Sequence, residues 1–258
     1  MGTRFLQIAD DFAWLNPHLT ITADWFGEKI SAKATDPVWA KWGPSDPTSP
    51  HWYTRQHFER LIAAYIAHDA DHGCKRTARE LVAEFRGLSG TAKQKAVLNA
   101  TGLAREPLSR LVNGNAIDPK LVESLLAAMQ ANSKPVKPAA LGIIGREHLR
   151  QQFAQAGCEM ESFDYRCVKE TTDGVPFVVE TAFAWCPENE SRRLVTGVNW
   201  SPGIINPFRE LGRFGQSLDT ILTKKRASEY EPVILILHIA CPRVEYTDRG
   251  KSSVVVAS

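Results

Sequence analysis

The residues best placed to do chemistry lie in the run EYTDRGKS, at positions 245–252. A phosphate-binding P-loop has the pattern GxxxxGK[ST] between a strand and a helix, and its backbone N–H groups surround the phosphates. Gly250, Lys251 and Ser252 fit the second half of this pattern. Glu245 stands where the first glycine is needed, and its side chain would fill the anion site. The run is therefore interpreted as an imperfect match. A nucleotide enzyme that uses it remains an alternative, which would need Lys251→Ala to abolish nucleotide binding.

The seven histidines form no Ser/His/Asp arrangement. His68 and His72 are one helical turn apart, a spacing that can hold a metal. The run HDADHG offers no clear third ligand, so it is interpreted as a solvated helix end. His238 lies within an apolar stretch and is interpreted as a core histidine with satisfied hydrogen bonds. The sequence thus predicts no catalytic residue and no metal site.

Basic side chains gather in residues 54–134, which hold twelve Lys or Arg against eight Asp or Glu, a net charge of +4. Basic helix faces beside glycine turns suit contact with phosphates, although any solvated helix face can look the same. The candidates for DNA contact are Lys75, Arg76, Arg79, Lys93 and Lys95.

The elements that must position these basic residues are predicted to be short helices separated by tight glycine turns. Thr54 and Thr77 can each cap a helix, and Thr91 can open a third; the apolar residues of these helices recur at spacings of three and four. Asp118 and Pro119 can begin another. This pattern is typical of a bundle of the helix–turn–helix kind.

The segments before this bundle have a different character. The stretch from Thr3 to Lys33 has apolar residues at alternating positions, at Leu19, Ile21, Ala23 and Trp25, which is strand spacing. Residues 36–53 hold four prolines and three tryptophans. The prolines oppose regular structure, whereas aromatic residues are scarce in disordered linkers. We expect an ordered, extended segment held by its indoles; an exposed aromatic binding patch is the alternative.

Beyond the proline-punctuated run SKPVKP at 133–138, the pattern becomes mixed α and β. The chain alternates apolar and polar residues, or is continuously apolar, in four predicted strands. The predicted helices cover residues 145–157 and 207–222, and the predicted strands cover residues 158–169, 176–185, 193–200 and 232–241.

Composition excludes several classes of protein. The chain has 258 residues, 43% of them hydrophobic and 23% charged, with a net charge of +2. These values are typical of a globular protein and unlike a histone-like basic one. No apolar run is long enough to span a bilayer, and acidic residues replace the apolar run of a signal peptide. Five scattered cysteines without CxxC spacing predict buried thiols in a reducing cytoplasm and no disulfide framework.

Several longer stretches resemble the B subunit of topoisomerase VI, the type IIB ATP-dependent DNA topoisomerase. The strongest is KWGPSDPTSPHWYT, followed by EFRGLSGTAKQK, which is similar to the passage from that family's ATPase domain into its helix-two-turns-helix domain. KPVKPAALGIIGREHL resembles the entry to the transducer domain. Three later runs resemble successive transducer strands and their loops: PFVVETAFAW, RLVTGVNWSPGIINPF and PVILILHIACPRVEYTDRGKSS. ADDFAWLNPHLTIT resembles the last strand region of a GHKL-type ATPase domain, so the likeness covers nearly the whole chain.

This resemblance implies an α+β fold: a small helix-two-turns-helix-like bundle followed by an α/β transducer domain with a left-handed βαβ crossover. It implies a remnant of the ATPase domain at residues 1–35 and a Pro/Trp-rich linker at 36–53. The helical domain would then cover residues 54–134, and a C-terminally truncated transducer would cover 135–258.

The resemblance also implies a function: coupling of ATP-driven dimerisation to the opening of a DNA gate. ATP and Mg are the family's cofactors, but the chain lacks an aspartate-glycine-x-glycine nucleotide motif. Alone it is therefore expected to hold no cofactor, to bind ATP poorly and to leave DNA cleavage to the A subunit. Its expected partners are an A-like subunit, double-stranded DNA and a second copy of the B subunit in the ATP-bound form. The expected location is the cytoplasm, at the nucleoid.

Two residues can be carried over from the family. Lys251 matches a transducer lysine whose ammonium reaches the γ-phosphate of the nucleotide, a contact that a compact charge on a flexible stem can make and release. Arg243 stands where the family has an earlier lysine in the same loop, and is the weaker candidate.

Two further interpretations of the whole chain remain open. One is a stand-alone DNA- or protein-binding module derived from such a subunit, which would bind plain duplex in a strongly salt-dependent way without any effect of ATP. The other is an inert fragment of a split gene, which an upstream reading frame encoding the missing nucleotide motif would support.

Overall fold

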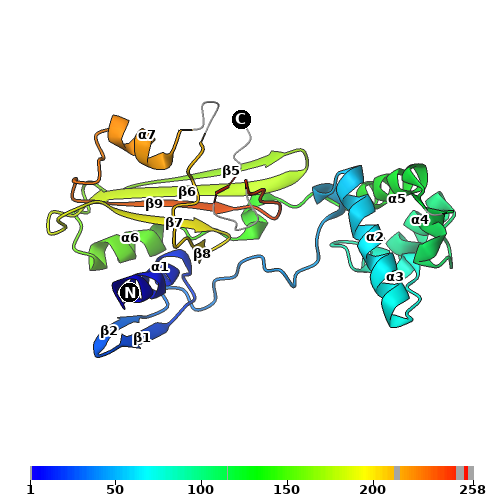
Figure 1. The fold of residues 1–258 in the computed structure, drawn as a ribbon, viewed down its shortest axis with the longest axis horizontal. Coiled ribbons are helices and arrows are strands. Elements are labelled where there is room, and N and C mark those ends of the chain that lie inside the picture. The colour runs from blue at the N-terminus through cyan, green and yellow to red at the C-terminus, as the bar shows by residue number, and fades with distance from the viewer. Residues whose placement is uncertain (1, 115, 212–215, 248–252, 255–258) are drawn as a thin grey trace. The chain divides into compact units, whose positions relative to one another are not determined.

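A computed structural model describes residues 2–114, 116–211, 216–247 and 253–254, and it divides the chain into two compact units (Figure 1). The first, here called the sheet unit, comprises Met1–Trp42, Pro138–Thr172 and Pro176–Ser258. The second, here called the helical unit, comprises Gly43–Lys137 with Asp173–Val175. The α+β class is confirmed, with a helical region followed by an α/β region.

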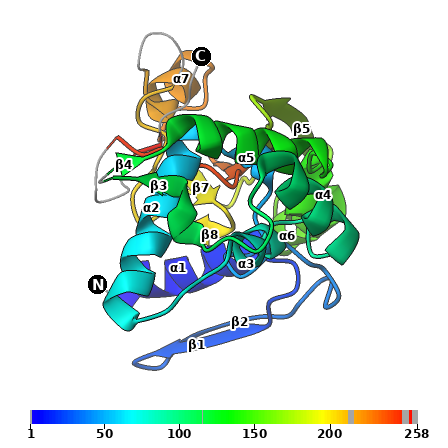
Figure 2. The same ribbon diagram turned by 90° about the vertical axis from the view of Figure 1, so that its right-hand side faces the viewer.

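The helical unit is built from four α-helices, two 3₁₀ turns and a very short hairpin, as Figure 2 shows. Their bounds are η1 Pro50–Trp52, α2 Arg55–His72, α3 Ala78–Ala83, α4 Thr91–Thr101, η2 Leu108–Leu111, β3 Val112–Asn113, β4 Ala116–Ile117 and α5 Pro119–Ala131. Helix α5 contacts both α2 and α4, and α3 contacts α4.

The starts of these helices follow from capping side chains. Thr54 caps α2, and Thr77 forms a capping box with Glu80 at the start of α3. Asp118 caps α5 by accepting two backbone N–H groups. Thr91 opens α4 as predicted, and the cap position before it belongs to Gly90, which offers no side-chain acceptor.

Amphipathic helix faces close into one apolar core in the helical unit. The buried members come from every α-helix of the unit, from η2 and from the loops after α3 and α4: Phe58, Ile62, Ala78, Leu81, Val82, Phe85, Leu88, Val97, Leu98, Leu103, Leu108, Leu111, Val122, Leu125, Leu126 and Met129.

The sheet unit holds a five-stranded mixed sheet in the order β5-β6-β9-β7-β8. The bounds of its elements are α1 Gly2–Leu15, β1 Ile21–Trp25, β2 Glu28–Ala32, η3 Pro138–Leu141, α6 Arg146–Gln155, β5 Asp164–Thr172, β6 Val175–Trp185, β7 Arg193–Val198, β8 Ser201–Pro202, α7 Leu218–Lys224 and β9 Val233–Ala240. Strand β9 is antiparallel to β6 and parallel to β7, so β7, α7 and β9 form a β-α-β unit. The left-handedness of this crossover remains a prediction.

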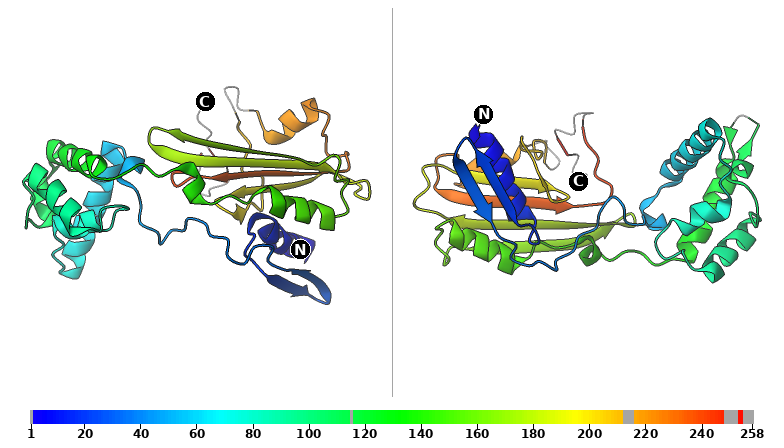
Figure 3. Two further views of the ribbon diagram at one scale, coloured as in Figure 1. Left: turned by 180° about the vertical axis from the view of Figure 1, so that it is seen from behind. Right: turned by 90° about the horizontal axis from the view of Figure 1, so that it is seen from below.

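Helices cover both faces of this sheet. Helices α1 and α6 lie on one face and α7 on the other (Figures 1 and 3). Helix α1 approaches β7 so closely that a Cβ at Gly197 would stand 2.4 Å from Leu15, so only glycine fits there. The β1–β2 hairpin packs on the same helix.

Three sequence predictions for the sheet unit need correction. The strand expected from the alternation at Leu19–Trp25 exists as β1, but residues 2–15 before it form a helix whose buried side is Ala9, Ala13 and Trp14. In the described part of the helix predicted at 207–222, only the residues from Leu218 onward are helical, where Ser217 caps the start of α7. Strand β5 begins at Asp164, several residues after the predicted start.

The prediction that the cysteines form no disulfide is also wrong. Cys158 and Cys186 are disulfide-bonded, across a sequence separation of 28 residues. Cys158 follows α6 and Cys186 follows β6, and only the tertiary fold brings these two ends together. Cys74, Cys167 and Cys241 are free thiols.

The tryptophan-rich linker is ordered in both units. In the sheet unit, the Trp39 indole N–H donates to the Ile143 carbonyl at 2.6 Å. In the helical unit, Trp52 is buried. The expectation of an ordered segment held by indoles is confirmed at Trp39, but the end of the segment forms η1 rather than extended backbone. Among the described residues, no helix combines the length and apolarity needed to cross a membrane.

Candidate functional site at the ends of β7 and β9

The parallel strands β7 and β9 bring two loops together at one edge of the sheet. Val198 at the end of β7 pairs with Ile239 near the end of β9. Ligand sites of open α/β sheets lie at such carboxyl ends, outside the strands. The loop that leaves β9 carries Arg243, so this edge is the natural candidate for a functional site.

Asn199 joins the two strand ends through its side chain. Its Nδ2 donates to the Cys241 carbonyl at 2.9 Å, and its Oδ1 accepts the Cys241 N–H at 2.8 Å. Its own backbone N–H donates to the Ile239 carbonyl at 2.8 Å. The side-chain amide of Asn199 therefore bonds both the N–H and the carbonyl of Cys241, the first residue after β9. We call this arrangement the Asn199 clamp.

The clamp sits in an unusual turn. Asn199 and Trp200 connect β7 to β8 and have φ values of 49° and 62°. Two-residue hairpin turns of this kind favour Asn first and Gly second, so a tryptophan in the second position is costly. Its surroundings hold it there: the Trp200 N–H donates to His238 Nε2 at 3.1 Å, and its carbonyl accepts from Asn16 Nδ2 at 2.9 Å.

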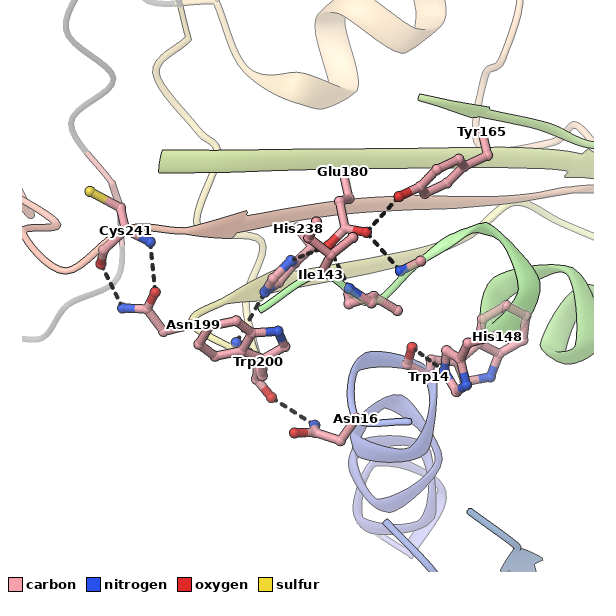
Figure 4. Close-up of polar contacts among 12 residues, drawn as sticks. Trp14, Asn16, Ile143, His148, Tyr165, Glu180, Asn199, Trp200, His238 and Cys241 are labelled. Atoms are coloured by element: carbon pink, nitrogen blue, oxygen red, sulfur yellow. Dashed lines mark hydrogen bonds and ion pairs between the residues drawn. The ribbon is translucent and has the colours of Figure 1, made fainter. Parts of the chain in front are cut away.

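A buried carboxylate lies close to this turn, on the far side of His238 from Trp200 (Figure 4). Glu180, on β6, is fully buried and accepts the backbone N–H groups of Ile144 and Gly145, each at 2.9 Å. It also accepts the Tyr165 hydroxyl at 2.8 Å and faces His238 Nδ1 at 3.5 Å. The Glu180 carboxylate thus ties β5, β6, β9 and the start of α6 together.

The charge states of this pair follow from burial and partners. Burial by itself raises the pKa of Glu180, but the hydrogen bonds from His238 and from two backbone N–H groups outweigh it and lower that pKa below its ordinary value. Burial lowers the pKa of His238, against the opposing pull of Glu180. Because Nε2 accepts the Trp200 N–H, the proton of the neutral ring is on Nδ1, facing Glu180.

The expectation that His238 is a core histidine is therefore confirmed, but only Nε2 has a hydrogen bond of ordinary geometry, because Nδ1 lies 3.5 Å from Glu180. Both ring nitrogens face partners and the side chain is fully buried. The Cys241 thiol offers no activated nucleophile either, because burial raises its pKa and its Sγ donates to the Arg243 carbonyl at 3.4 Å. The described groups of this site make contacts that position the loop after β9.

Of the two candidates for contact with a nucleotide, only Arg243 lies within the described residues. Arg243 lies two residues beyond the Asn199 clamp and is half-buried. Lys251, together with Gly250 and Ser252 of the imperfect P-loop, lies outside the described residues. Thr247 and Val254 on either side of that stretch are placed: the Thr247 N–H donates to the Ser253 carbonyl at 2.9 Å, and the Val254 N–H donates to the Pro207 carbonyl at 2.9 Å.

The five DNA-contact candidates fall on three segments of the helical unit. Arg79 on α3 donates from Nε to Gln94 on α4 at 2.9 Å, and Lys93 donates to the Gly87 carbonyl at 2.8 Å. Both side chains are therefore engaged in hydrogen bonds within the α3–α4 region of the helical unit. Lys75 and Lys95 are exposed.

Arg76 differs from the other four, because its guanidinium is engaged inside the unit. It lies 4.0 Å from the Tyr65 ring centroid and pairs with Asp69 and Glu84, each at 3.8 Å. Its backbone N–H donates to the Asp69 carboxylate at 3.3 Å. These contacts connect the end of α2 to the start of α3, which is a structural role.

The histidine pair on α2 matches the expectation of a solvated helix end. The rings of His68 and His72 are exposed with centroids 4.1 Å apart, and His72 Nδ1 lies 2.8 Å from the His68 carbonyl. No group of three His, Cys, Asp or Glu side chains suited to a metal occurs within the described part of the chain.

Sequence reasoning missed Glu180, Asn199 and Trp200. A signal existed for two of them. Glu180 is a lone acid within an apolar strand, and such an acid needs a buried partner, which the equally isolated His238 supplies. Asn followed by one residue between two extended segments is a hairpin signal. Nothing in the sequence indicated that Asn199 would reach Cys241.

Comparison with known proteins gives no family. No protein-family profile and no curated protein matches the chain. Among solved structures, there is a weak similarity to the B subunit of DNA gyrase from Myxococcus xanthus, at 17% identity and a TM-score of 0.25, over 36% of this chain and 29% of that chain. A leucine aminopeptidase variant from tomato matches at 10% identity and a TM-score of 0.18, over 94% of this chain and 54% of that chain. The chain thus spans less than two thirds of either protein, and at these TM-scores neither likeness identifies a function.

Proposed function

We propose that this chain is part of the B subunit of an ATP-dependent type IIB DNA topoisomerase, and that it couples ATP-driven dimerisation to opening of the DNA gate. The proposal rests on the ordered stretches that resemble the B subunit of topoisomerase VI. The observation that carries it furthest is the β7-α7-β9 unit, whose last strand is followed in the sequence by Arg243 and then Lys251.

In this proposal the loop after β9 reads the terminal phosphate of ATP held by the enzyme's ATPase domain. The Lys251 ammonium contacts the γ-phosphate, and Arg243 supports it with a second positive charge. Hydrolysis removes the phosphate and releases the contact, so the sheet unit changes position between the two states. An A-like subunit supplies the cleaving tyrosine, and duplex DNA and a second copy of the B subunit complete the assembly.

The test uses the complex captured from the native cells with an antibody against the sheet unit. The captured complex is assayed for ATP-dependent relaxation of supercoiled plasmid, and the intact mass of the captured polypeptide is measured. We expect relaxation that needs ATP, and its loss in cells carrying Lys251→Ala. Lys225→Ala, which removes an exposed lysine just after α7, is the matched control and should retain activity.

The result that contradicts the proposal is a captured complex without any ATP-dependent relaxation, or Lys251→Ala that behaves like Lys225→Ala. A polypeptide of 28.7 kDa in the native cells would also count against an ATP-driven mechanism within this chain.

The second candidate is a stand-alone module that binds DNA through the helical unit. The exposed Lys75 and Lys95 and the net charge of +4 over residues 54–134 favour it. Removal of one lysine that contacts a phosphate should lower the salt slope of binding by about one. Lys95→Ala is therefore expected to reduce that slope, whereas Lys120→Ala, on the exposed side of α5, is not. Binding that ignores both salt and Lys95 excludes this candidate.

A further inference from the structure

The Asn199 clamp has a consequence for the loop after β9. The structure assigns Asn199 the role of a positioning residue: its amide fixes the backbone of Cys241 and so sets where the loop carrying Arg243 leaves the sheet. The inference deepens the proposed function, on which its biological meaning rests, but its geometry stands on the described residues alone.

On the side of β9 that faces β7, the Cys241 backbone is held by the Asn199 side chain. Ala240 is the last residue of β9, and β7 ends at Val198. Strand β6, on the other side of β9, runs on to Val175, but β7 offers no further residue of strand to Cys241. The Asn199 side chain supplies both an acceptor and a donor instead, at 2.8 and 2.9 Å. A side-chain amide here imitates one further residue of strand pairing.

The clamp is itself held in place. Asn199 and Trp200 are both in the left-handed region, at φ 49° and 62°. Such a conformation persists when its surroundings over-determine it, and it tends to occur at functional positions. Here the buried His238 accepts the Trp200 N–H, and Asn16 at the end of α1 donates to the Trp200 carbonyl.

Trp200 is also contacted by distant parts of the sheet unit. Lys41 lies 5.5 Å from the Trp200 ring centroid, and a Cβ on Gly142 would be only 3.1 Å from Trp200 Cζ2. The turn therefore contacts the segment that leaves the hairpin and the segment that precedes α6. A displacement of either segment would reach the Cys241 backbone through Trp200 and Asn199.

The thiol of Cys241 reports on the clamp directly. It is half-buried, and burial raises its pKa, so it should react slowly while the loop root is fixed. Cys74 on the helical unit is exposed and provides an internal reference in the same molecule. The measured quantity is the ratio of the alkylation rates of Cys241 and Cys74 with iodoacetamide, followed by mass spectrometry of the full chain.

The decisive variant is Asn199→Gly. Glycine adopts a positive φ without cost, so the turn keeps its shape while the side-chain amide disappears. We expect the Cys241/Cys74 ratio to rise by about fivefold or more, the order expected when hydrogen bonds holding a segment are lost. Arg226→Gly is the matched control: Arg226 has φ 63°, is exposed and lies in the turn after α7, so the same relief of strain should leave the ratio unchanged.

A second variant covers the case in which Asn199→Gly does not fold. Asn199→Asp keeps the acceptor for the Cys241 N–H and replaces the donor that faces the Cys241 carbonyl with an oxygen, so it should give an intermediate rise. Hydrogen exchange over residues 241–247 gives an independent readout, with faster exchange expected in both variants and with the amides of β9 unaffected.

The inference is overturned if folded Asn199→Gly, or folded Asn199→Asp when the glycine variant is not folded, gives the wild-type ratio and wild-type exchange over residues 241–247. It is also overturned if Arg226→Gly raises the ratio equally, because the effect would then be a general loosening. None of these measurements needs nucleotide, DNA or an A-like subunit. A negative relaxation assay with a positive clamp result therefore rejects the proposed function alone, and the reverse outcome rejects only the positioning role.

Discussion

The two units bury different kinds of side chains. The core of the helical unit is apolar, and the charged Asp69 and the amide of Gln94 are at its margins, bonded to neighbouring loops. The sheet unit buries acids, histidines, amides and hydroxyls among its apolar residues. Among the described residues these are Asp11, Asn16, His148, Gln152, Glu180, Thr196, His238 and Ser253.

The difference concerns specificity as much as stability. An apolar core tolerates many arrangements of similar volume, whereas a buried polar group is stable only when each partner stands in place. In the sheet unit the partners of Glu180, Asn16 and Asn199 come from segments far apart in sequence. This network can therefore fix the relative positions of loops, and the candidate site lies among those loops.

The largest effect that would sharpen this comparison is expected from Glu180→Ala. The change removes the acceptor of two backbone N–H groups and one hydroxyl and leaves His238 without its partner. Breaking a buried pair from one side costs about 3–5 kcal/mol. Urea unfolding followed by tryptophan fluorescence measures the loss, since only Trp52 of the seven tryptophans lies in the helical unit.

The control for that change is Thr181→Ala, at the next position on β6, whose side chain points to the other face of the sheet. It should cost much less. If Glu180→Ala cost under about 1 kcal/mol, the network would be incidental to the fold, because even a single buried unsatisfied group exceeds that value.

The matching change in the helical unit is Leu125→Ala. Leu125 is fully buried on α5, and its truncation should cost about 2–5 kcal/mol through lost transfer energy and the cavity left behind. Far-UV circular dichroism follows this transition. Leu125→Met, which conserves volume, should cost less than about 1.5 kcal/mol. A comparable loss in both variants would contradict a core stabilised by packing alone.

Sequence reasoning succeeded where the physics is local. The caps Thr54, Thr77 and Asp118 and the alternation of β6 are properties of neighbouring residues, and each appears in the structure as predicted. The α+β class follows from the same patterns. Sequence reasoning failed at α1, where the acidic Asp10 and Asp11 obscured the helical spacing. Their presence in this helix is explained by the ion pairs that both form with Arg193 on β7.

The candidate site was less predictable, because it depends on contacts between distant segments. The Cys158–Cys186 disulfide and the Asn199–Cys241 contact join residues 28 and 42 positions apart. The isolated Glu180 and His238 are visible in the sequence as charges within apolar strands, but their pairing follows only from the antiparallel register of β6 and β9, which sets them opposite each other.

A moderate effect is expected from acidification, and it should be confined to the sheet unit. Burial lowers the pKa of both His148 and His238 in the folded chain. Their contribution to stability is therefore fully present above the unfolded histidine pKa of about 6.5 and is lost as the pH falls below it, by at most about 1.4 kcal/mol per histidine per pH unit.

The measurement compares urea unfolding by tryptophan fluorescence at about pH 7.5 and about pH 5.5, on either side of the unfolded histidine pKa. His238→Gln should reduce the pH slope of the sheet unit, because glutamine does not titrate, and His148→Gln provides a second, independent reduction. An unchanged slope in both variants would mean that the buried histidines are not the source of the pH dependence.

The smallest effect concerns the helix caps, where the two units should not differ. Thr77 caps α3 in the helical unit and Ser217 caps α7 in the sheet unit, each accepting the backbone N–H three residues on. A cap satisfies a donor within its own turn, so its value depends little on the core beneath. Thr77→Ala and Ser217→Ala should each cost about 1 kcal/mol, measured by urea unfolding, and Thr77→Ser should restore most of the loss. A much larger cost at Ser217 would show that the crossover helix takes part in the polar network, which would extend that network across the sheet to the face opposite α1.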